Sequence, residues 1–129
     1  MRKAIFITVR SASTRLPNKC YITIKGKPTI EYVIAQAKKA KLADIVILCT
    51  TKNKEDKLVR WQAAAKMFNI DFFVTADGDD LFCSHELFDV AFDQYNNLEV
   101  DFIEGKDIVC GSFTYGIKTS ALNEVCHRK

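Results

Sequence analysis

Two short polar segments, one basic and one acidic, carry the residue types best suited to chemistry. The basic segment, residues 10–19, reads RSASTRLPNK and holds three cations among small hydroxyl side chains. Backbone N–H groups, hydroxyls and cations in such a loop can donate to phosphate oxygens, and arginine can hold two oxygens at once. The loop has neither the spacing of a P-loop nor any glycine of a dinucleotide-binding fingerprint. It therefore predicts a different kind of phosphate site, with a solvated basic loop as the alternative.

The acidic segment, residues 75–81, reads TADGDDL and places Asp77, Asp79 and Asp80 around Gly78. Carboxylate oxygens are hard ligands that suit Mg²⁺, which usually takes one or two carboxylates and completes its shell with phosphates and water. The downstream glutamate of an EF-hand is missing. The segment therefore indicates a magnesium site for a nucleotide, with a plain acidic turn as the alternative.

Apolar runs before both segments predict the strands that position them. Residues 3–9, 45–49 and 71–74 are short apolar runs rich in β-branched and aromatic residues, typical of strands buried on both faces. Weaker strands are predicted at 100–103 and 112–117.

Between these strands, apolar residues recur at helical spacing. Helices are predicted after Pro28, after a cap at Asn53, after a cap at Ser84, and from Thr119 to the end. The residues expected to face inward are Ile30, Val33, Ile34 and Ala37 in the first helix, Leu58, Trp61, Ala65 and Phe68 in the second, and Leu87, Val90, Ala91 and Leu98 in the third. Alternating strands and helices predict an α/β fold with a mainly parallel sheet flanked by helices. Ligands of such sheets bind outside the carboxyl ends of the strands, where both polar segments lie.

The charge is divided unevenly along the 129 residues. The first 60 residues hold 14 Lys/Arg and 4 Asp/Glu, whereas the rest hold 5 and 12, for a net charge of +3. This division suits a site that clamps polyphosphate at one end and a divalent cation at the other, with charges scattered over solvated faces as the alternative. No apolar run approaches the roughly 20 residues of a membrane span, and no aromatic-interleaved basic patch indicates nucleic acid. We expect a soluble, cytoplasmic protein that binds neither membranes nor nucleic acid.

The cysteines indicate neither a disulfide framework nor zinc. They are odd in number and widely scattered, without a C-x-x-C pair: Cys20, Cys49, Cys83, Cys110 and Cys126. We expect small, mostly buried apolar residues in a reducing compartment.

The basic segment and the helix after it resemble the N-terminal motif of acylneuraminate and 3-deoxy-manno-octulosonate cytidylyltransferases. In that family the loop reads A-R-x-G-S-x-R-L-P-G-K, and a G-K-P element follows. The loop matches at Arg10, Ser13, Arg15, Leu16, Pro17 and Lys19, and Gly26-Lys27-Pro28 matches the second element. Cys49-Thr50-Thr51 falls at the family's A-T-T, and Gly78-Asp79 at its G-D.

The resemblance implies a Rossmann-like nucleotide-diphospho-sugar transferase fold. It also implies transfer of CMP from CTP to an acidic sugar, with release of pyrophosphate, in polysaccharide precursor synthesis. The roles it implies are catalytic cations at Arg10, Arg15 and Lys19, nucleotide contacts at Ser13, Thr14, Thr50 and Thr51, and a Mg²⁺ ligand at Asp79, with Asp77 and Asp80 ranked behind it.

Several departures from the family pattern leave alternatives open. Ala12 and Asn18 replace two glycines, and the stretch between Thr51 and Trp61 is shorter than the family's helix–strand unit there. Later family residues would lie beyond Lys129, so we expect a single domain over residues 1–129, shortened at its C-terminal end. Uncovered apolar residues in the last helix favour association into a homo-oligomer. A UTP- or GTP-using enzyme and a nucleotide-binding domain without turnover are the other two readings.

Overall fold

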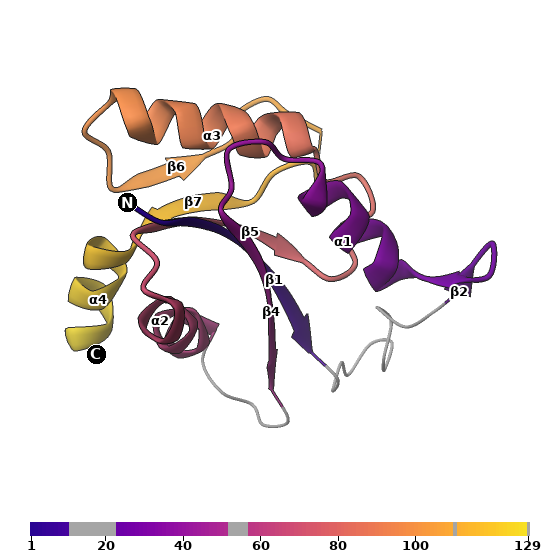
Figure 1. Cartoon of the computed structure of the whole chain (residues 1–129), viewed down its shortest axis with the longest axis horizontal. Coiled ribbons are helices and arrows are strands. Elements are labelled where there is room, and N and C mark those ends of the chain that lie inside the picture. Colours follow the sequence, from indigo (N-terminus) through magenta and orange to yellow (C-terminus); the bar gives the residue numbers. More distant parts are fainter. Residues whose placement is uncertain (11–22, 52–56, 110, 129) are drawn as a thin grey trace.

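The computed structural model describes residues 1–10, 23–51, 57–109 and 111–128 (Figure 1). Its elements are β1 (Lys3–Arg10), β2 (Thr23–Ile24), β3 (Lys27–Pro28), α1 (Thr29–Lys38), β4 (Ile45–Thr51), α2 (Lys57–Phe68), β5 (Phe72–Asp77), α3 (His85–Asn97), β6 (Phe102–Glu104), β7 (Tyr115–Lys118) and α4 (Thr119–His127).

The main sheet has five strands in the order β4-β1-β5-β7-β6. β4, β1 and β5 are parallel, whereas β7 runs antiparallel to β5, and β6 antiparallel to β7. The three parallel strands are the three apolar runs of the sequence. The predicted α/β fold with a mainly parallel sheet is therefore confirmed.

Helices cover both faces of the sheet, with α1 and α3 on one face and α2 and α4 on the other (Figure 1). Alternate residues of β1 point to opposite faces, as a strand requires. One core contains Ile5, Ile7, Val33, Phe88 and Phe92, and the other contains Phe6, Trp61, Ala65, Phe73 and Leu122. In the second core the rings of Phe6 and Phe73 stack with centroids 4.3 Å apart.

A short hairpin, β2–β3, leads into α1. Its turn residues Lys25 and Gly26 both have positive φ, 52° and 82°, as a two-residue hairpin loop requires. The Tyr32 hydroxyl donates to the Ile24 carbonyl at 2.6 Å and fastens the hairpin to the helix. Gly26 of the G-K-P element therefore suits a position where the backbone has a positive φ.

The inward face of α3 differs from the prediction. Ser84 caps the helix as predicted, accepting from the Leu87 N–H at 3.2 Å. Val90 and Leu98, predicted to face inward, are 49% and 57% exposed. Ala91 is buried as predicted. Phe88 and Phe92 take the place of Val90 and Leu98 in the core, since this stripe of the helix puts two large aromatic side chains out of water.

The last helix, α4, is also covered more fully than its sequence indicated. Leu122 is buried against α2, and the Gln62 amide donates to the Asn123 side chain at 3.0 Å. Val125 remains 50% exposed. The expectation of uncovered apolar residues in this helix is wrong for Leu122, which packs against α2, and is confirmed for Val125.

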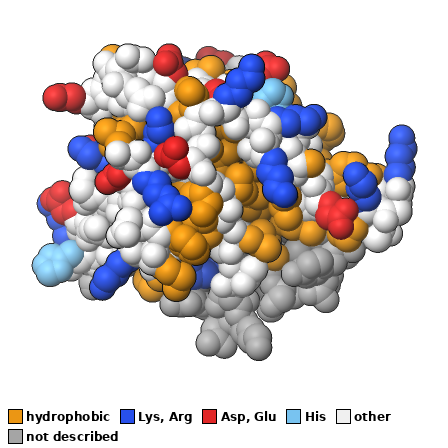
Figure 2. All heavy atoms as spheres, viewed as in Figure 1, with side chains coloured by type: hydrophobic (Ala, Val, Ile, Leu, Met, Phe, Trp, Pro, Cys, Tyr) orange, Lys and Arg blue, Asp and Glu red, His pale blue; other side chains and the backbone are white. Residues whose placement is uncertain are grey.

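β4 forms one edge of the sheet, and no strand of the described residues pairs with its outer side. Leu48 on this strand is 47% exposed, and Figure 2 shows apolar side chains across the middle of the face viewed. An uncharged edge strand with exposed apolar residues favours pairing with another chain.

Within the described ranges, every helix is too short or too polar to cross a bilayer. Cys49 and Cys83 are buried free thiols and Cys126 is a partly buried one, as predicted for these three.

Candidate functional site

The carboxyl ends of β4, β1 and β5 meet at one edge of the sheet. Arg10, at the end of β1, is in register with Thr51 at the end of β4. Thr8 is in register with Asp77 at the end of β5. The predicted nucleotide contacts on β4 and the acidic turn therefore lie at the same edge as the start of the basic segment. The candidates Ser13, Thr14, Arg15 and Lys19 lie outside the described residues, as does the predicted cap Asn53.

The acidic turn is held tightly against the end of β1. The Gly78 N–H donates to the Thr8 carbonyl at 2.8 Å. The Asp77 N–H donates to the Asp80 carboxylate at 2.9 Å, and the Asp80 N–H returns a bond to the Asp77 carbonyl at 3.0 Å. A Cβ on Gly78 would stand 3.1 Å from side-chain atoms of Val9 and Ile30, a tight contact that these side chains would have to relieve by a small shift.

The carboxylates of this turn have different surroundings. Asp77 accepts from the Lys57 ammonium at 3.0 Å, and both side chains are about two-fifths exposed (42% and 40%). Burial raises the pKa of Asp80, and the hydrogen bond from the Asp77 backbone opposes that rise. Asp79 is partly exposed and also has an interaction partner.

The acidic turn can supply one or two carboxylates to Mg²⁺ but not a complete set of protein ligands. In the part of the chain that the structure describes, no three His, Cys, Asp or Glu side chains gather as a metal cage. Mg²⁺ commonly binds through one or two carboxylates together with substrate phosphates, and this turn can supply that many. The ranking of Asp79 ahead of Asp77 and Asp80 stays a prediction.

Helix α2 brings further polar residues to this edge that sequence reasoning missed. The Trp61 indole N–H donates to the Thr8 hydroxyl at 3.0 Å in the interior. The Lys57 ammonium lies 5.4 Å from the centroid of the Trp61 ring, within cation–π range, as well as on Asp77. Arg60, on the same helix, donates to the Val9 carbonyl at the end of β1. The only sequence signal for these contacts was the spacing of Lys57 and Trp61, which lie four residues apart and so on one side of a helix.

The buried Trp61–Thr8 bond gives a stability prediction. Thr8→Val keeps the shape but leaves the indole N–H unpaired, so the free energy of unfolding should fall by about 1–3 kcal/mol. Urea denaturation measures this change. Thr75→Val is the matched control, because the Thr75 hydroxyl is buried and has no hydrogen-bond partner among the described residues. Its removal should leave stability unchanged or raise it, and equal losses in both variants would contradict the assignment.

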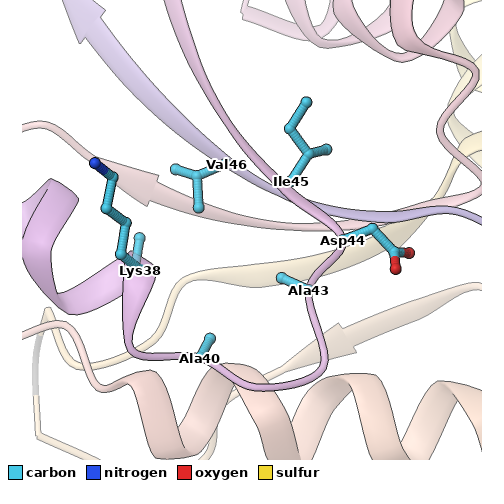
Figure 3. Close-up of a pocket in the computed structure, with 7 residues that line it drawn as sticks. Lys38, Ala40, Ala43, Asp44, Ile45 and Val46 are labelled. Atoms are coloured by element: carbon cyan, nitrogen blue, oxygen red, sulfur yellow. The ribbon is translucent and has the colours of Figure 1, made fainter.

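A cavity of about 270 Å³ lies elsewhere, between the end of α1 and the start of β4 (Figure 3). It is lined by Ala37, Lys38, Ala40, Ala43, Asp44, Ile45 and Val46. The Asp44 carboxylate accepts from the Lys3 N–H at 2.8 Å, so it is engaged in structure. This cavity is at the amino end of β4, and the polar residues of the site converge on the opposite edge.

A mainly parallel sheet flanked by helices defines an α/β domain, a class that binds its ligands outside the carboxyl ends of the strands. The family model described as "Cytidylyltransferase" matches residues 4–68, half of the chain, and the chain belongs to this family.

Among curated proteins, the chain is 28% identical over 131 residues to a 3-deoxy-manno-octulosonate cytidylyltransferase of Chloroherpeton thalassium, covering 87% of this chain and 50% of that protein. It is 26% identical over 126 residues to an uncharacterized protein of Methanocaldococcus jannaschii, covering 81% and 52%. The chain thus spans about half the length of these relatives.

Two solved structures share the fold. A cytidylyltransferase from Leptospira borgpetersenii superposes with a TM-score of 0.89 at 22% identity, covering 98% of this chain and 64% of that one. A CMP:2-keto-3-deoxy-manno-octonic acid synthetase complexed with CTP gives 0.80 at 13% identity, covering 98% and 78%. At these identities the likeness shows the fold alone, which is the predicted nucleotide-diphospho-sugar transferase fold.

Proposed function

We propose that the chain binds CTP at the carboxyl edge of β4, β1 and β5, as part of a protein that transfers CMP to an acidic sugar. The observation that carries the proposal is the strand register, which puts Arg10, Thr51 and the acidic turn at three adjacent strand ends. Membership of the cytidylyltransferase family supports the choice of nucleotide.

In the proposed reaction an acceptor hydroxyl loses its proton and bonds to the α-phosphorus of CTP. The bond from that phosphorus to the pyrophosphate breaks in line. The protein contributes position and charge neutralisation rather than a covalent intermediate. Arg10, Arg15 and Lys19 neutralise the phosphates and the leaving pyrophosphate.

The remaining candidates hold the nucleotide. Ser13 and Thr14 donate hydroxyls to phosphate, and Thr50 and Thr51 contact the nucleotide from the end of β4. Bound Mg²⁺ would supply charge stabilisation on the phosphates. Asp79 would hold it first, with Asp77 and Asp80 behind.

A second candidate function is nucleotide binding without turnover. It is favoured by the length of the chain, which is about half that of the curated relatives it matches. The remaining alternative is an enzyme that uses UTP or GTP instead of CTP. Competition between the three nucleotides for binding to the chain distinguishes this alternative from the proposal.

The phosphate loop gives the direct test of the proposal. Lys19→Ala and Arg15→Ala should each weaken CTP binding by about 1–3 kcal/mol, the loss expected for one charge-assisted contact. Isothermal titration calorimetry measures the affinity. Lys38→Ala, at the end of α1, is the control for a general loss of positive charge and should bind CTP like the parent. Unchanged affinity in both loop variants would remove the proposed phosphate site.

A further inference from the structure

Arg60 is the one buried charged side chain in the described part of the chain, with 8% of its surface exposed. It lies on α2, one turn after Lys57. Through Trp61 this helix contacts Thr8 on the face of the sheet that it covers. An arginine keeps its charge in proteins, so this position places a permanent cation in the interior.

The described residues do little to compensate this cation. Its Nη1 donates to the Val9 carbonyl at 3.4 Å, longer than an ordinary N–H···O bond, and its Nε is buried without a hydrogen-bond partner among the described residues. No Asp or Glu of the described residues forms an ion pair with it. The nearby Cys49 thiol cannot serve as the counter-ion, since burial raises its pKa to about 11 although the guanidinium lowers it. At neutral pH that thiol is uncharged.

An ionised group buried in this way costs stability unless an anion or full hydrogen bonding offsets it. Among the described residues no carboxylate supplies that anion, and Arg60 lies close to the proposed nucleotide site. The Val9 carbonyl stands at the end of β1, beside the acidic turn and the proposed nucleotide site.

We propose that Arg60 binds a phosphate oxyanion of the nucleotide or of pyrophosphate at the end of β1. The planar fork of the guanidinium suits two oxygens of one phosphate group. Lys57, at the first turn of the same helix, supplies a second positive charge to the site. The inference rests on the proposed function, because that function supplies the polyphosphate.

The test is the binding of inorganic pyrophosphate and of CTP to the 129-residue chain, by calorimetry and by the shift in unfolding midpoint. Arg60→Met should lower the affinity for pyrophosphate about tenfold or more, the equivalent of one charge-assisted bidentate contact. Without ligand its unfolding midpoint should equal or exceed that of the parent, because a buried charge with no ion-pair partner among the described residues is gone. Pyrophosphate should raise the midpoint of the parent and not that of the variant.

Arg2→Met is the matched control. The Arg2 guanidinium also donates to a backbone carbonyl, that of Phe68 at 3.1 Å, but at the other end of α2. Its loss should leave pyrophosphate binding unchanged. Cytidine, which has no phosphate, should bind the parent and Arg60→Met alike.

Each other outcome decides the matter. Parent-like pyrophosphate affinity in Arg60→Met would overturn the inference and leave the proposed function standing. Lost binding together with a lower unfolding midpoint would mark Arg60 as structural and also overturn it. If Arg60→Met does not fold, Arg60→Lys decides: a clear loss of pyrophosphate affinity supports the role of the fork, and equal affinity refutes it. A parent that binds neither CTP nor pyrophosphate would refute the proposed function itself.

Discussion

Magnesium should strengthen the binding of CTP to this chain by about tenfold or more, and Asp79→Asn should remove that gain. The reason is electrostatic: a divalent cation shared between a carboxylate and phosphates brings two anionic groups together that otherwise repel. The substitution keeps the size of the side chain and removes its charge. Calorimetric titration of CTP with and without MgCl₂ measures the enhancement in both proteins.

The neighbouring aspartates supply the controls for this prediction. Asp80→Asn should keep the turn, because an amide oxygen can still accept from the Asp77 N–H. Asp77→Asn loses the ion pair with Lys57, which is partly exposed and weak in water. Both should reduce the magnesium effect less than Asp79→Asn. A folded Asp79→Asn protein that responds to Mg²⁺ like the parent would reduce the segment to an acidic turn.

The parallel part of the fold was predictable from sequence because its strands are buried on both faces. A run such as residues 3–9 is apolar at nearly every position, which a surface helix or an exposed loop cannot sustain. The inward residues of α1 and α2 also followed from their spacing, since each helix has one dominant apolar stripe. Ile30, Val33 and Ala37 are buried in α1, and Trp61 and Ala65 in α2, as predicted.

The face of α3 was not predictable by the same rule, because this helix carries two overlapping apolar stripes. The predicted stripe contains Val90 and Leu98, although Leu98 lies just past the end of the helix, and the other contains Phe88 and Phe92. The stripe that faces the sheet is the one that finds partners there: the ring of Phe92 packs edge-to-face on Phe72 of β5, with centroids 6.0 Å apart. Periodicity alone cannot rank two stripes when a distant strand supplies the partner.

For the site, sequence reasoning predicted which strand ends lie at one edge but not the contacts beneath them. Parallel strands end at one edge, so Thr51 and Asp77 were expected near the start of the basic loop. The bonds from Trp61 to Thr8 and from Arg60 to Val9 join residues more than 50 positions apart. No local pattern encodes such pairs, and a buried arginine looks like any surface arginine in a sequence.

The largest effect is expected for turnover by the 129-residue chain alone. We expect Mg²⁺-dependent binding of CTP but pyrophosphate release at least about 10²-fold slower than by a relative twice its length, because small misplacements of reactants cost that much. The proposed contacts to phosphate and metal are local to the ends of β1 and β5. Holding the acceptor in line requires further surfaces, and the chain spans only about half of its curated relatives.

The test is a pyrophosphate-release assay with CTP and a panel of acidic sugars, run beside light scattering. The cytidylyltransferase of Chloroherpeton thalassium is the reference enzyme. Self-association should accompany the low turnover, since Leu48 on the outer strand and Val125 on α4 are 47% and 50% exposed. Leu48→Lys should then reduce the scattering without raising turnover, which separates the effect of association from the low turnover itself. Rapid pyrophosphate release by a monodisperse monomer would show that these 129 residues carry the complete reaction.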